Sequence, residues 1–242
     1  MCFKDFIVKI LTKGFYDPTW RCNGCGKEMF GDRFFCEECE KHLPYNDKIV
    51  CEHCGRAIKS PSAYCSTCKE ILLSVDKARS AFNYDKPISG LIKKAKYDNG
   101  RYILDYFATK LANLYFAEFA SSEVVCCVPM SKKRLKKRGY NQSELLAKKV
   151  AEIINVPFSD CVAKNKETAR QAKLKRSKRL KNLTDSFQIK DKNAVRGKNI
   201  LLIDDVTTTG ATAEAVAVKL KKAGALRVHM ITVASVPSKD GY

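Results

Sequence analysis

Eight cysteines of this sequence occur in four Cys-x-x-Cys pairs. The pairs are Cys22/Cys25, Cys36/Cys39, Cys51/Cys54 and Cys65/Cys68. Ten residues separate the first pair from the second, ten separate the third from the fourth, and each cysteine of the first half recurs 29 positions later. Two such pairs supply four thiolates, which complete the tetrahedral shell of a structural Zn²⁺ ion. The repeat therefore predicts two structural zinc ions, with adjacent pairing of the cysteines favoured over interleaved pairing.

Other roles for these cysteines are less consistent with the pattern. A thioredoxin-type redox role would place the motif in a βαβ unit, whereas four motifs fall within 47 residues that show no such unit. His53 lies inside the third pair, but the first repeat has Gly24 at the equivalent position, so we interpret His53 as a bystander. Zinc ribbons bind nucleic acid, bind protein or cap another domain, and the sequence does not choose among these roles.

A second candidate site lies in the run ILLIDDVTTTGAT at residues 200–212. Four apolar residues predict a buried strand, two acids follow it, and a hydroxyl-rich loop with one glycine leads into a predicted helix. Backbone N–H groups at a helix start bind anions, and glycine lets the chain approach a phosphate closely. The Walker and dinucleotide-binding glycine patterns are both missing from this run. Two carboxylates ahead of a phosphate loop instead predict a site for a ribose 5-phosphate, with a plain strand-to-helix turn as the alternative.

All thirteen positions of this run resemble the signature of type I phosphoribosyltransferases, which bind phosphoribosyl pyrophosphate (PRPP). The resemblance implies that Asp204 and Asp205 bind the ribose hydroxyls. It also implies that the loop residues cradle the 5′-phosphate, and the candidate ligands there are Thr207, Thr208, Thr209, Gly210, Ala211 and Thr212.

A longer part of the chain resembles the ComF family of competence proteins. Segment 128–147 has the family's Val-Pro, then Arg, then Arg-Gly-aromatic-Asn-Gln, at Arg134, Arg138, Gly139, Tyr140, Asn141 and Gln142. Segment 168–187 matches at Thr168, Gln171, Leu174, Arg179, Asn182 and Phe187, with Ala169 where the family often has proline. That family also has an N-terminal zinc-ribbon region, so the resemblance spans about 21–235. It implies a role in DNA uptake during natural transformation.

The elements that must position these residues follow from hydrophobic patterning. Buried strands are predicted at 124–129 and 200–203, and helices at 102–119, 141–155 and 213–223. Arg134 and Arg138 fall in a predicted loop after the first strand, at the edge of the sheet where parallel α/β proteins bind ligands. They are the candidate catalytic residues, placed to meet a pyrophosphate group together with Mg²⁺. Residues 2–14 predict an amphipathic helix that docks on the protein or lies on a membrane surface.

Charge and hydropathy limit the class of protein. The 242 residues include 45 Lys and Arg against 26 Asp and Glu, which gives a net charge of +19. Such a charge indicates a polyanionic partner, and segment 164–181 is especially basic, so we expect it to form a mobile lid or a nucleic-acid-binding arm. The sequence contains no run of 18 apolar residues, so it predicts no transmembrane helix. It also shows no evident secretory signal. The sequence predicts a cytoplasmic protein, with the inner face of the cytoplasmic membrane as a further location.

We therefore expect an α/β chain in three parts. The predicted parts are an N-terminal amphipathic segment at 1–20, a double zinc ribbon at 21–70 and a type I phosphoribosyltransferase fold, with a parallel sheet flanked by helices, at 75–242. The expected function is DNA uptake, with binding of PRPP, Mg²⁺ and single-stranded DNA and with DNA-uptake proteins as further partners. The alternative is an active phosphoribosyltransferase of nucleotide metabolism or salvage, in which the ribbon is a structural cap. The sequence leaves open whether transfer activity exists.

Overall fold

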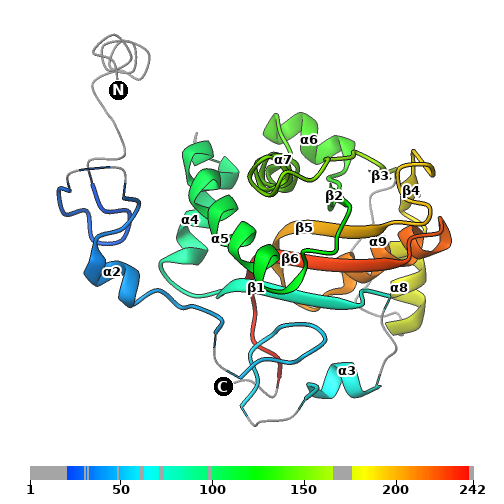
Figure 1. Cartoon of the computed structure of the whole chain (residues 1–242), viewed down its shortest axis with the longest axis horizontal. Helices are drawn as coiled ribbons and strands as arrows, with labels where there is room; N and C mark the ends of the chain where they lie inside the picture. Colours follow the sequence, from blue (N-terminus) through cyan, green and yellow to red (C-terminus); the bar gives the residue numbers. More distant parts are fainter. Residues whose placement is uncertain are drawn as a thin grey trace. The chain divides into compact units, whose positions relative to one another are not determined.

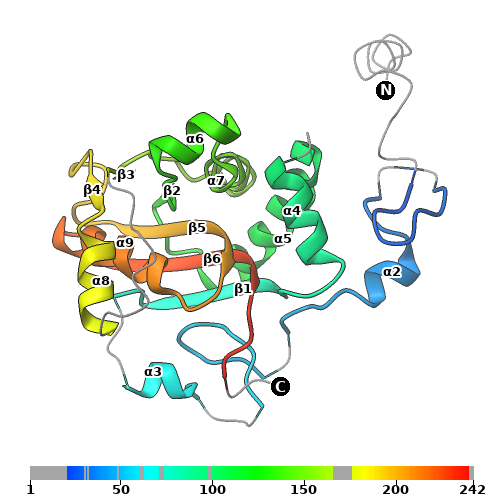
Figure 2. The same ribbon diagram turned by 180° about the vertical axis from the view of Figure 1, so that it is seen from behind.

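The computed structural model in Figures 1 and 2 describes most of the chain after residue 20. The described residues are 21–29, 31, 33–47, 49–59, 63–70, 74–97, 100–165 and 176–239. The predicted helix at 2–14 lies outside them. The chain divides into two compact units, Met1–Leu43 and Pro44–Tyr242. None of the described helices is long and apolar enough to cross a bilayer.

The described residues of the first unit contain the first cysteine repeat and a short helix, α2 (Glu37–Lys41). Arg21 and Glu28 form an isolated antiparallel bridge across the turn that carries Cys22 and Cys25. Cys36 caps α2, because its sulfur accepts a hydrogen bond from the backbone N–H of Cys39. Few apolar side chains are buried among its described residues, which is typical of small units that a bound metal stabilises.

The second unit is built on a four-stranded parallel sheet in the order β1-β6-β5-β2. Its strands are β1 (Lys77–Asn83), β2 (Val124–Cys127), β5 (Asn199–Thr207) and β6 (Arg227–Ser235). A smaller antiparallel pair consists of β3 (Val162–Lys164) and β4 (Phe187–Ile189). The predicted strands at 124–129 and 200–203 correspond to β2 and β5, which are buried on both faces.

Helices cover both faces of the parallel sheet, as Figures 1 and 2 show from opposite sides. One face contacts α5 (Ile103–Glu118) and α7 (Gln142–Ile154), with α4 (Ile88–Tyr97) and the short 3₁₀ turn η2 (Gly100–Tyr102) packed beside α5. The other face contacts α9 (Ala211–Lys222), which packs against α8 (Arg176–Thr184). Side chains of β5 alternate between the faces, so Ile200 and Leu202 join the core cluster that includes Val216 and Leu220 of α9. The sheet therefore holds the end of β5 and the start of α9 rigidly together.

The segment after β2 differs from the prediction of a loop, because it forms helix α6 (Lys132–Arg138). Ser131 has the extended conformation of an N-cap, and Gly139 ends the helix in the left-handed region with φ of 81°. The cap N–H of Gly139 bonds the carbonyl of Leu135. Lysine, arginine and leucine are good helix formers, so the sequence between these two caps favours a helix over a loop.

The second cysteine repeat belongs to the second unit, whereas the sequence pattern grouped both repeats in one domain at 21–70. Helix α3 (Ser66–Glu70) carries Cys68, and the turn at Cys51–Gly55 lies against β1. The backbone N–H of Ala78 donates to the carbonyl of His53 at 2.7 Å, and the N–H of Asn46 donates to the carbonyl of Ala81 at 3.1 Å. These bonds to a sheet strand explain why the boundary between the compact units falls before the second repeat.

The basic segment 164–181 lies between β3 and β4. Residues 166–175 of this expected lid or arm are outside the described residues. The described part forms the end of β3 and the start of α8, and the backbone N–H of Asn165 bonds the carbonyl of Ser186 at 2.9 Å. The segment is thus anchored at both ends beside the sheet.

Candidate functional site

Each cysteine repeat brings its own four sulfur atoms together. The two clusters are Cys22, Cys25, Cys36 and Cys39, and Cys51, Cys54, Cys65 and Cys68. Within each cluster the four sulfurs lie within 4.8 Å of one another, and His53 belongs to neither cluster. The structure therefore brings the sulfurs together within each repeat, which is the adjacent arrangement that the sequence favours.

The geometry of both clusters fits a tetrahedral zinc ion. Zn–S bonds of about 2.3 Å place neighbouring sulfurs roughly 3.8 Å apart in a tetrahedron. The observed separations are 3.9 Å between Cys25 and Cys36 and 3.8 Å between Cys54 and Cys65. Backbone N–H groups also point at sulfur, since those of Cys36 and Cys65 donate to Cys22 and Cys51 at 3.3 Å. Four sulfurs close the shell, so both sites suit structural zinc and leave no position for a substrate.

The predicted phosphate loop connects the C-terminal end of β5 to the N-terminus of α9. Gly210 is the N-cap residue of α9 and has φ of 75°, a conformation that L side chains rarely adopt. The first turn of a helix leaves several N–H groups without intrahelical partners, and the helix dipole is positive there. Thr208 and Thr209 are exposed, and Thr212 is half-buried. This end of the sheet can therefore receive an anion.

Two of the predicted loop ligands have local partners of their own. The hydroxyl of Thr207 lies 3.9 Å from the sulfur of buried Met230, so this side chain faces the core. The hydroxyl of Thr209 accepts a weak bond from the N–H of Ala211 at 3.4 Å. Ala211 itself is exposed and offers only its backbone. The loop thus presents the hydroxyls of Thr208, Thr209 and Thr212 beside the helix start.

The two predicted ribose ligands lie at the end of β5 and contact residues from α4 and α7. Asp205 accepts a hydrogen bond from Gln142 Nε2 at 2.5 Å and pairs with Lys96 Nζ at 2.7 Å, both at Oδ2. Asp204 accepts from the hydroxyl of Ser143 at 2.8 Å and from the backbone N–H of Asp205 at 2.9 Å. Three separate elements therefore position the carboxylate pair.

Burial and the neighbouring charge of Asp205 raise the pKa of Asp204 to about 7, although the bond from Ser143 and the charge of Lys96 act in the opposite direction. A half-buried carboxyl beside a second carboxylate is harder to ionise than one in water. The site therefore holds one carboxyl that changes charge near neutral pH.

The two candidate catalytic arginines have different surroundings. Arg138, at the end of α6, donates from Nη1 to Gln142 Oε1 at 2.6 Å, and Gln142 in turn donates to Asp205. Arg134 is exposed on α6. Tyr140, which the sequence resemblance singled out, donates its hydroxyl to the carbonyl of Ala95 at 2.6 Å, beside Lys96. The structure thus links Arg138 to the carboxylate pair through Gln142. Arg134, one helical turn earlier in α6, is exposed on the surface.

Three contributors to this site were not identified from the sequence. Lys96 pairs with Asp205, Ser143 donates to Asp204, and Arg56 donates to the carbonyl of Thr208 at 3.0 Å. Ser143 directly follows Asn141 and Gln142 of the ComF-like motif. Its position in the first turn of a predicted helix could have identified it as a residue of the site. Lys96 and Arg56 lie in lysine-rich and cysteine-rich segments where nothing distinguishes them from their neighbours.

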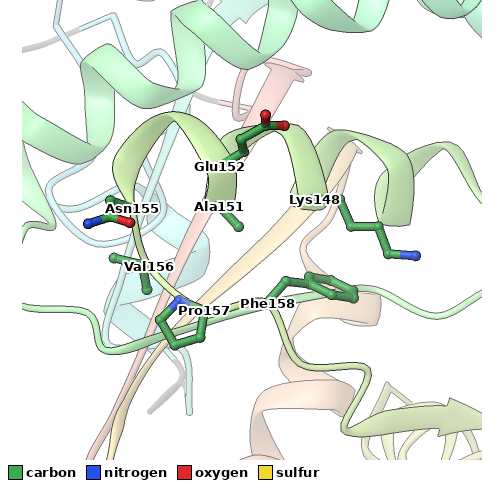
Figure 3. Close-up of a pocket in the computed structure, with 7 residues that line it drawn as sticks. All are labelled: Lys148, Ala151, Glu152, Asn155, Val156, Pro157 and Phe158. Carbon is green, nitrogen blue, oxygen red and sulfur yellow. The ribbon is translucent and has the colours of Figure 1, made fainter.

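A separate hollow of about 440 Å³ lies at the other end of α7 (Figure 3). The residues that line it are Lys148, Ala151, Glu152, Asn155, Val156, Pro157 and Phe158. None of the predicted site residues belongs to it, and the ammonium group of Lys148 lies 5.4 Å from the ring centre of Phe158. The hollow is therefore distinct from the carboxylate pair and the phosphate loop.

Two family models match separate parts of the chain. A phosphoribosyl transferase domain matches residues 140–241, and a double zinc ribbon domain matches residues 13–69. The protein thus combines a double zinc ribbon with a type I phosphoribosyltransferase fold, as the sequence predicted.

Curated relatives extend the similarity over most of the chain. Competence protein F of Haemophilus influenzae is 28% identical over 226 residues, which cover 88% of this chain and 95% of that protein. Competence protein ComFC of Bacillus subtilis is 29% identical over 203 residues, covering 81% and 80%. DNA utilization protein YhgH of Escherichia coli K12 is 26% identical over 224 residues, covering 86% and 87%. The chain is therefore similar over most of its length to ComF-type competence proteins, and the sequence resemblance is confirmed.

The two cysteine clusters predict the metal content of the protein. Elemental analysis of freshly purified full chain should find about two zinc ions per chain, because each cluster supplies a complete shell. Replacing Cys36 and Cys39 with serine should lower the content to about one. A content near one in the unaltered chain would contradict the assignment of one of the clusters.

The raised pKa of Asp204 predicts that this carboxylate lowers stability near neutral pH. The folded chain keeps a proton on Asp204 that an unfolded aspartate loses at about pH 4. The penalty is thus absent at low pH and grows as pH rises toward about 7. Asp204→Asn keeps the acceptor oxygen for Ser143 and removes the charge, so its melting temperature should exceed that of the unaltered chain at pH 8 and approach it at pH 5.

Thermal unfolding across this pH range measures the effect. Asp105→Asn is the matched control, because Asp105 is an exposed carboxylate that pairs with Lys149. A melting temperature of Asp204→Asn at or below that of the unaltered chain at pH 8 would show that the surroundings fully compensate the carboxylate.

Proposed function

We propose that this ComF-family protein acts in DNA uptake and that its phosphoribosyltransferase domain binds PRPP or a related phosphoribosyl compound. One juxtaposition carries the proposal, namely two carboxylates at the end of β5 followed directly by a phosphate loop at the start of α9. A ribose 5-phosphate has a diol at one end and a dianionic phosphate at the other, so it matches these two features in order.

The carboxylates and the loop have different tasks in this proposal. Asp204 and Asp205 accept hydrogen bonds from the two ribose hydroxyls, which ionised carboxylates do strongly. Backbone N–H groups of the first turn of α9, with the hydroxyls of Thr208, Thr209 and Thr212, bind the 5′-phosphate. Lys96 forms an ion pair with Asp205 and so holds this carboxylate in place.

The pyrophosphate end of PRPP extends, in our proposal, toward the side of the site that α6 and α7 form. Of the two candidate arginines, Arg138 is linked to the carboxylate pair, because it donates to Gln142, which in turn donates to Asp205. Arg134 would add a second cation. When bound, Mg²⁺ would neutralise part of the pyrophosphate charge. In this proposal the described side chains at this end of the sheet bind a polyanionic sugar.

Binding of single-stranded DNA is the second part of the proposal. Helix α6 carries six cations in seven residues, and five of them are exposed: Lys132, Lys133, Arg134, Lys136 and Lys137. The net charge of +19 supports a polyanionic partner of this kind. The relatives named for competence and DNA utilization support a role in handling DNA, in which uptake proteins are further partners.

The alternative is an active phosphoribosyltransferase of nucleotide metabolism or salvage. In that reaction the bond between C1 of PRPP and pyrophosphate breaks, a nitrogen nucleophile forms a bond to C1, and pyrophosphate leaves. Positioning and charge stabilisation carry most of such a reaction. The complete carboxylate pair and loop support it, whereas no described residue is an evident general base for the acceptor. Release of pyrophosphate upon addition of PRPP and a purine or pyrimidine base would establish it.

The PRPP assignment predicts a binding defect when both carboxylates are neutralised. Asp204→Asn with Asp205→Asn should weaken PRPP by roughly 1.5–3 kcal/mol for each charge-assisted hydrogen bond lost. That loss is about tenfold to a hundredfold per bond. Isothermal titration with PRPP and Mg²⁺ measures it, and Asp105→Asn should bind normally. Undiminished affinity for PRPP in the double variant would contradict the assignment of the two carboxylates to the ribose hydroxyls.

The DNA proposal predicts that affinity for an oligonucleotide depends on α6. Replacing Lys132, Lys133, Lys136 and Lys137 with glutamine should weaken single-stranded DNA binding and make the salt dependence shallower by up to about 3 in a log–log plot. Fluorescence anisotropy at several salt concentrations measures both. The same replacement of four scattered exposed lysines, Lys59, Lys86, Lys192 and Lys222, is the matched control.

Equal effects of the two variants would mean that general charge, and not α6, attracts DNA. The same titration with PRPP and Mg²⁺ present tests whether the two ligands share Arg134, Arg138 and the 164–181 segment. We expect competition, and simultaneous binding without mutual effect would show two separate sites.

A further inference from the structure

A buried arginine connects the second cysteine cluster to the phosphate loop. Arg56 is only 7% exposed. Its Nη1 atom donates to the backbone carbonyl of Thr208 at 3.0 Å, and its Nη2 atom lies 3.8 Å from the sulfur of Cys65. One guanidinium group therefore contacts both a predicted zinc ligand and the loop that we propose binds phosphate.

The backbone around Arg56 is fixed against β1. Gly55 has φ of 66°, and a Cβ atom added there would lie 2.4 Å from the carbonyl oxygen of Ala78. The carbonyl of Gly55 accepts a hydrogen bond from Asn46 Nδ2 at 2.6 Å. A turn packed this closely cannot shift without moving the strand, so the position of the guanidinium is set by the ribbon.

Further bonds join both ends of the second ribbon to the phosphate loop and its helix. After β6, the N–H of Val236 donates to the carbonyl of Thr207 at 2.9 Å, and that of Ser238 donates to the carbonyl of Ala57 at 3.1 Å. Glu214, in the first turn of α9, is buried and accepts the N–H of Ser74 on both oxygens, at 2.8 and 2.9 Å. The segments on both sides of the cysteine cluster thus reach the loop region.

The first repeat has a different side chain at the equivalent position, although its local fold is the same. Lys27 stands 29 positions before Arg56, and its carbonyl accepts the N–H of Cys22 at 2.8 Å as that of Arg56 accepts the N–H of Cys51 at 2.9 Å. Lys27 is exposed, whereas Arg56 is buried. Arginine offers a planar set of donors that reaches two acceptors at once, which a lysine ammonium does not do in the same way.

The thiolates of a zinc-bound cluster would compensate the charge of an arginine in the interior. Zinc with four thiolates carries a net negative charge, and N–H groups near the sulfurs compensate part of it. A buried guanidinium is costly without such a counter-charge. Removing the metal would let the thiolates take up protons. Arg56 would then lose its anionic partner, and its bond to the carbonyl of Thr208 would be weakened.

We propose that Arg56 is a positioning residue of the phosphate loop and that metal in the Cys51/Cys54/Cys65/Cys68 cluster holds it in place. The affinity of the loop for a sugar phosphate then depends on metal in the second cluster and not on metal in the first. The affinity part of this inference rests on the proposed binding of phosphoribosyl compounds, whereas the order of the loop does not.

The test uses the full chain and the variants Arg56→Met, Arg56→Lys and Lys27→Met. Ribose 5-phosphate is titrated by calorimetry, and amide hydrogen exchange is followed at residues 208–212. Arg56→Met should lower the affinity about tenfold and speed exchange in the loop while zinc content stays unchanged. Arg56→Lys should recover part of both effects, because it keeps a cation of similar reach, and Lys27→Met should change neither.

Metal removal provides a second test that does not depend on replacing Arg56. The Cys36→Ser, Cys39→Ser variant retains the second cluster, so it should bind ribose 5-phosphate like the unaltered chain. When a chelator then removes its remaining zinc, loop exchange should speed up and affinity should fall in step with zinc release. Zinc release with both quantities unchanged would overturn the proposal, as would an Arg56→Met variant with normal exchange at 208–212.

The two readouts separate this inference from the proposed function. A chain that does not bind ribose 5-phosphate contradicts the proposed function, and loop exchange still decides the role of Arg56. A chain that binds the ligand equally well with and without Arg56 contradicts the positioning role alone.

Discussion

Two carboxylates lie side by side at the end of a buried strand, and their mutual repulsion constrains the elements around them. Lys96 from α4 and Gln142 from α7 both contact Asp205, and Ser143 from α7 contacts Asp204. Tyr140 fixes the start of α7 to the end of α4 through the carbonyl of Ala95. The carboxylate pair thus depends on how α4 and α7 pack against the sheet.

The contacts from α4 and α7 offset the cost of placing the two carboxylates together only in part. The pKa of Asp204 remains raised to about 7, so a charge is held in the folded protein at a cost in stability. A core built for stability alone would have an apolar residue or a single acid at this point. Local features that lower stability are concentrated at functional sites, and the carboxylate pair has this character.

The cysteine repeats show how one sequence pattern can have two structural roles. Both repeats form the same turn and the same four-sulfur cluster. The first belongs to a small unit of its own, whereas the second is bonded to β1 and belongs to the phosphoribosyltransferase unit. The repeats differ at single positions, such as Arg56 in place of Lys27. A division of the chain by motif therefore differs from its division by packing.

The sequence by itself predicted the two four-cysteine clusters, the strand-to-helix loop at residues 204–212 and the α/β class. These features depend on residues close together in the chain, where spacing and periodicity report geometry directly. Helix α6 was missed because six basic residues and one leucine show no apolar face, although Ser131 and Gly139 gave capping signals at both ends. Only the tertiary structure decided that Lys96 pairs with Asp205, that Gln142 links Arg138 to it and that Arg56 reaches Thr208 across 152 positions of sequence. Contacts of this kind depend on how helices and the ribbon pack on the sheet, and a lysine or arginine carries no local pattern that names its distant partner.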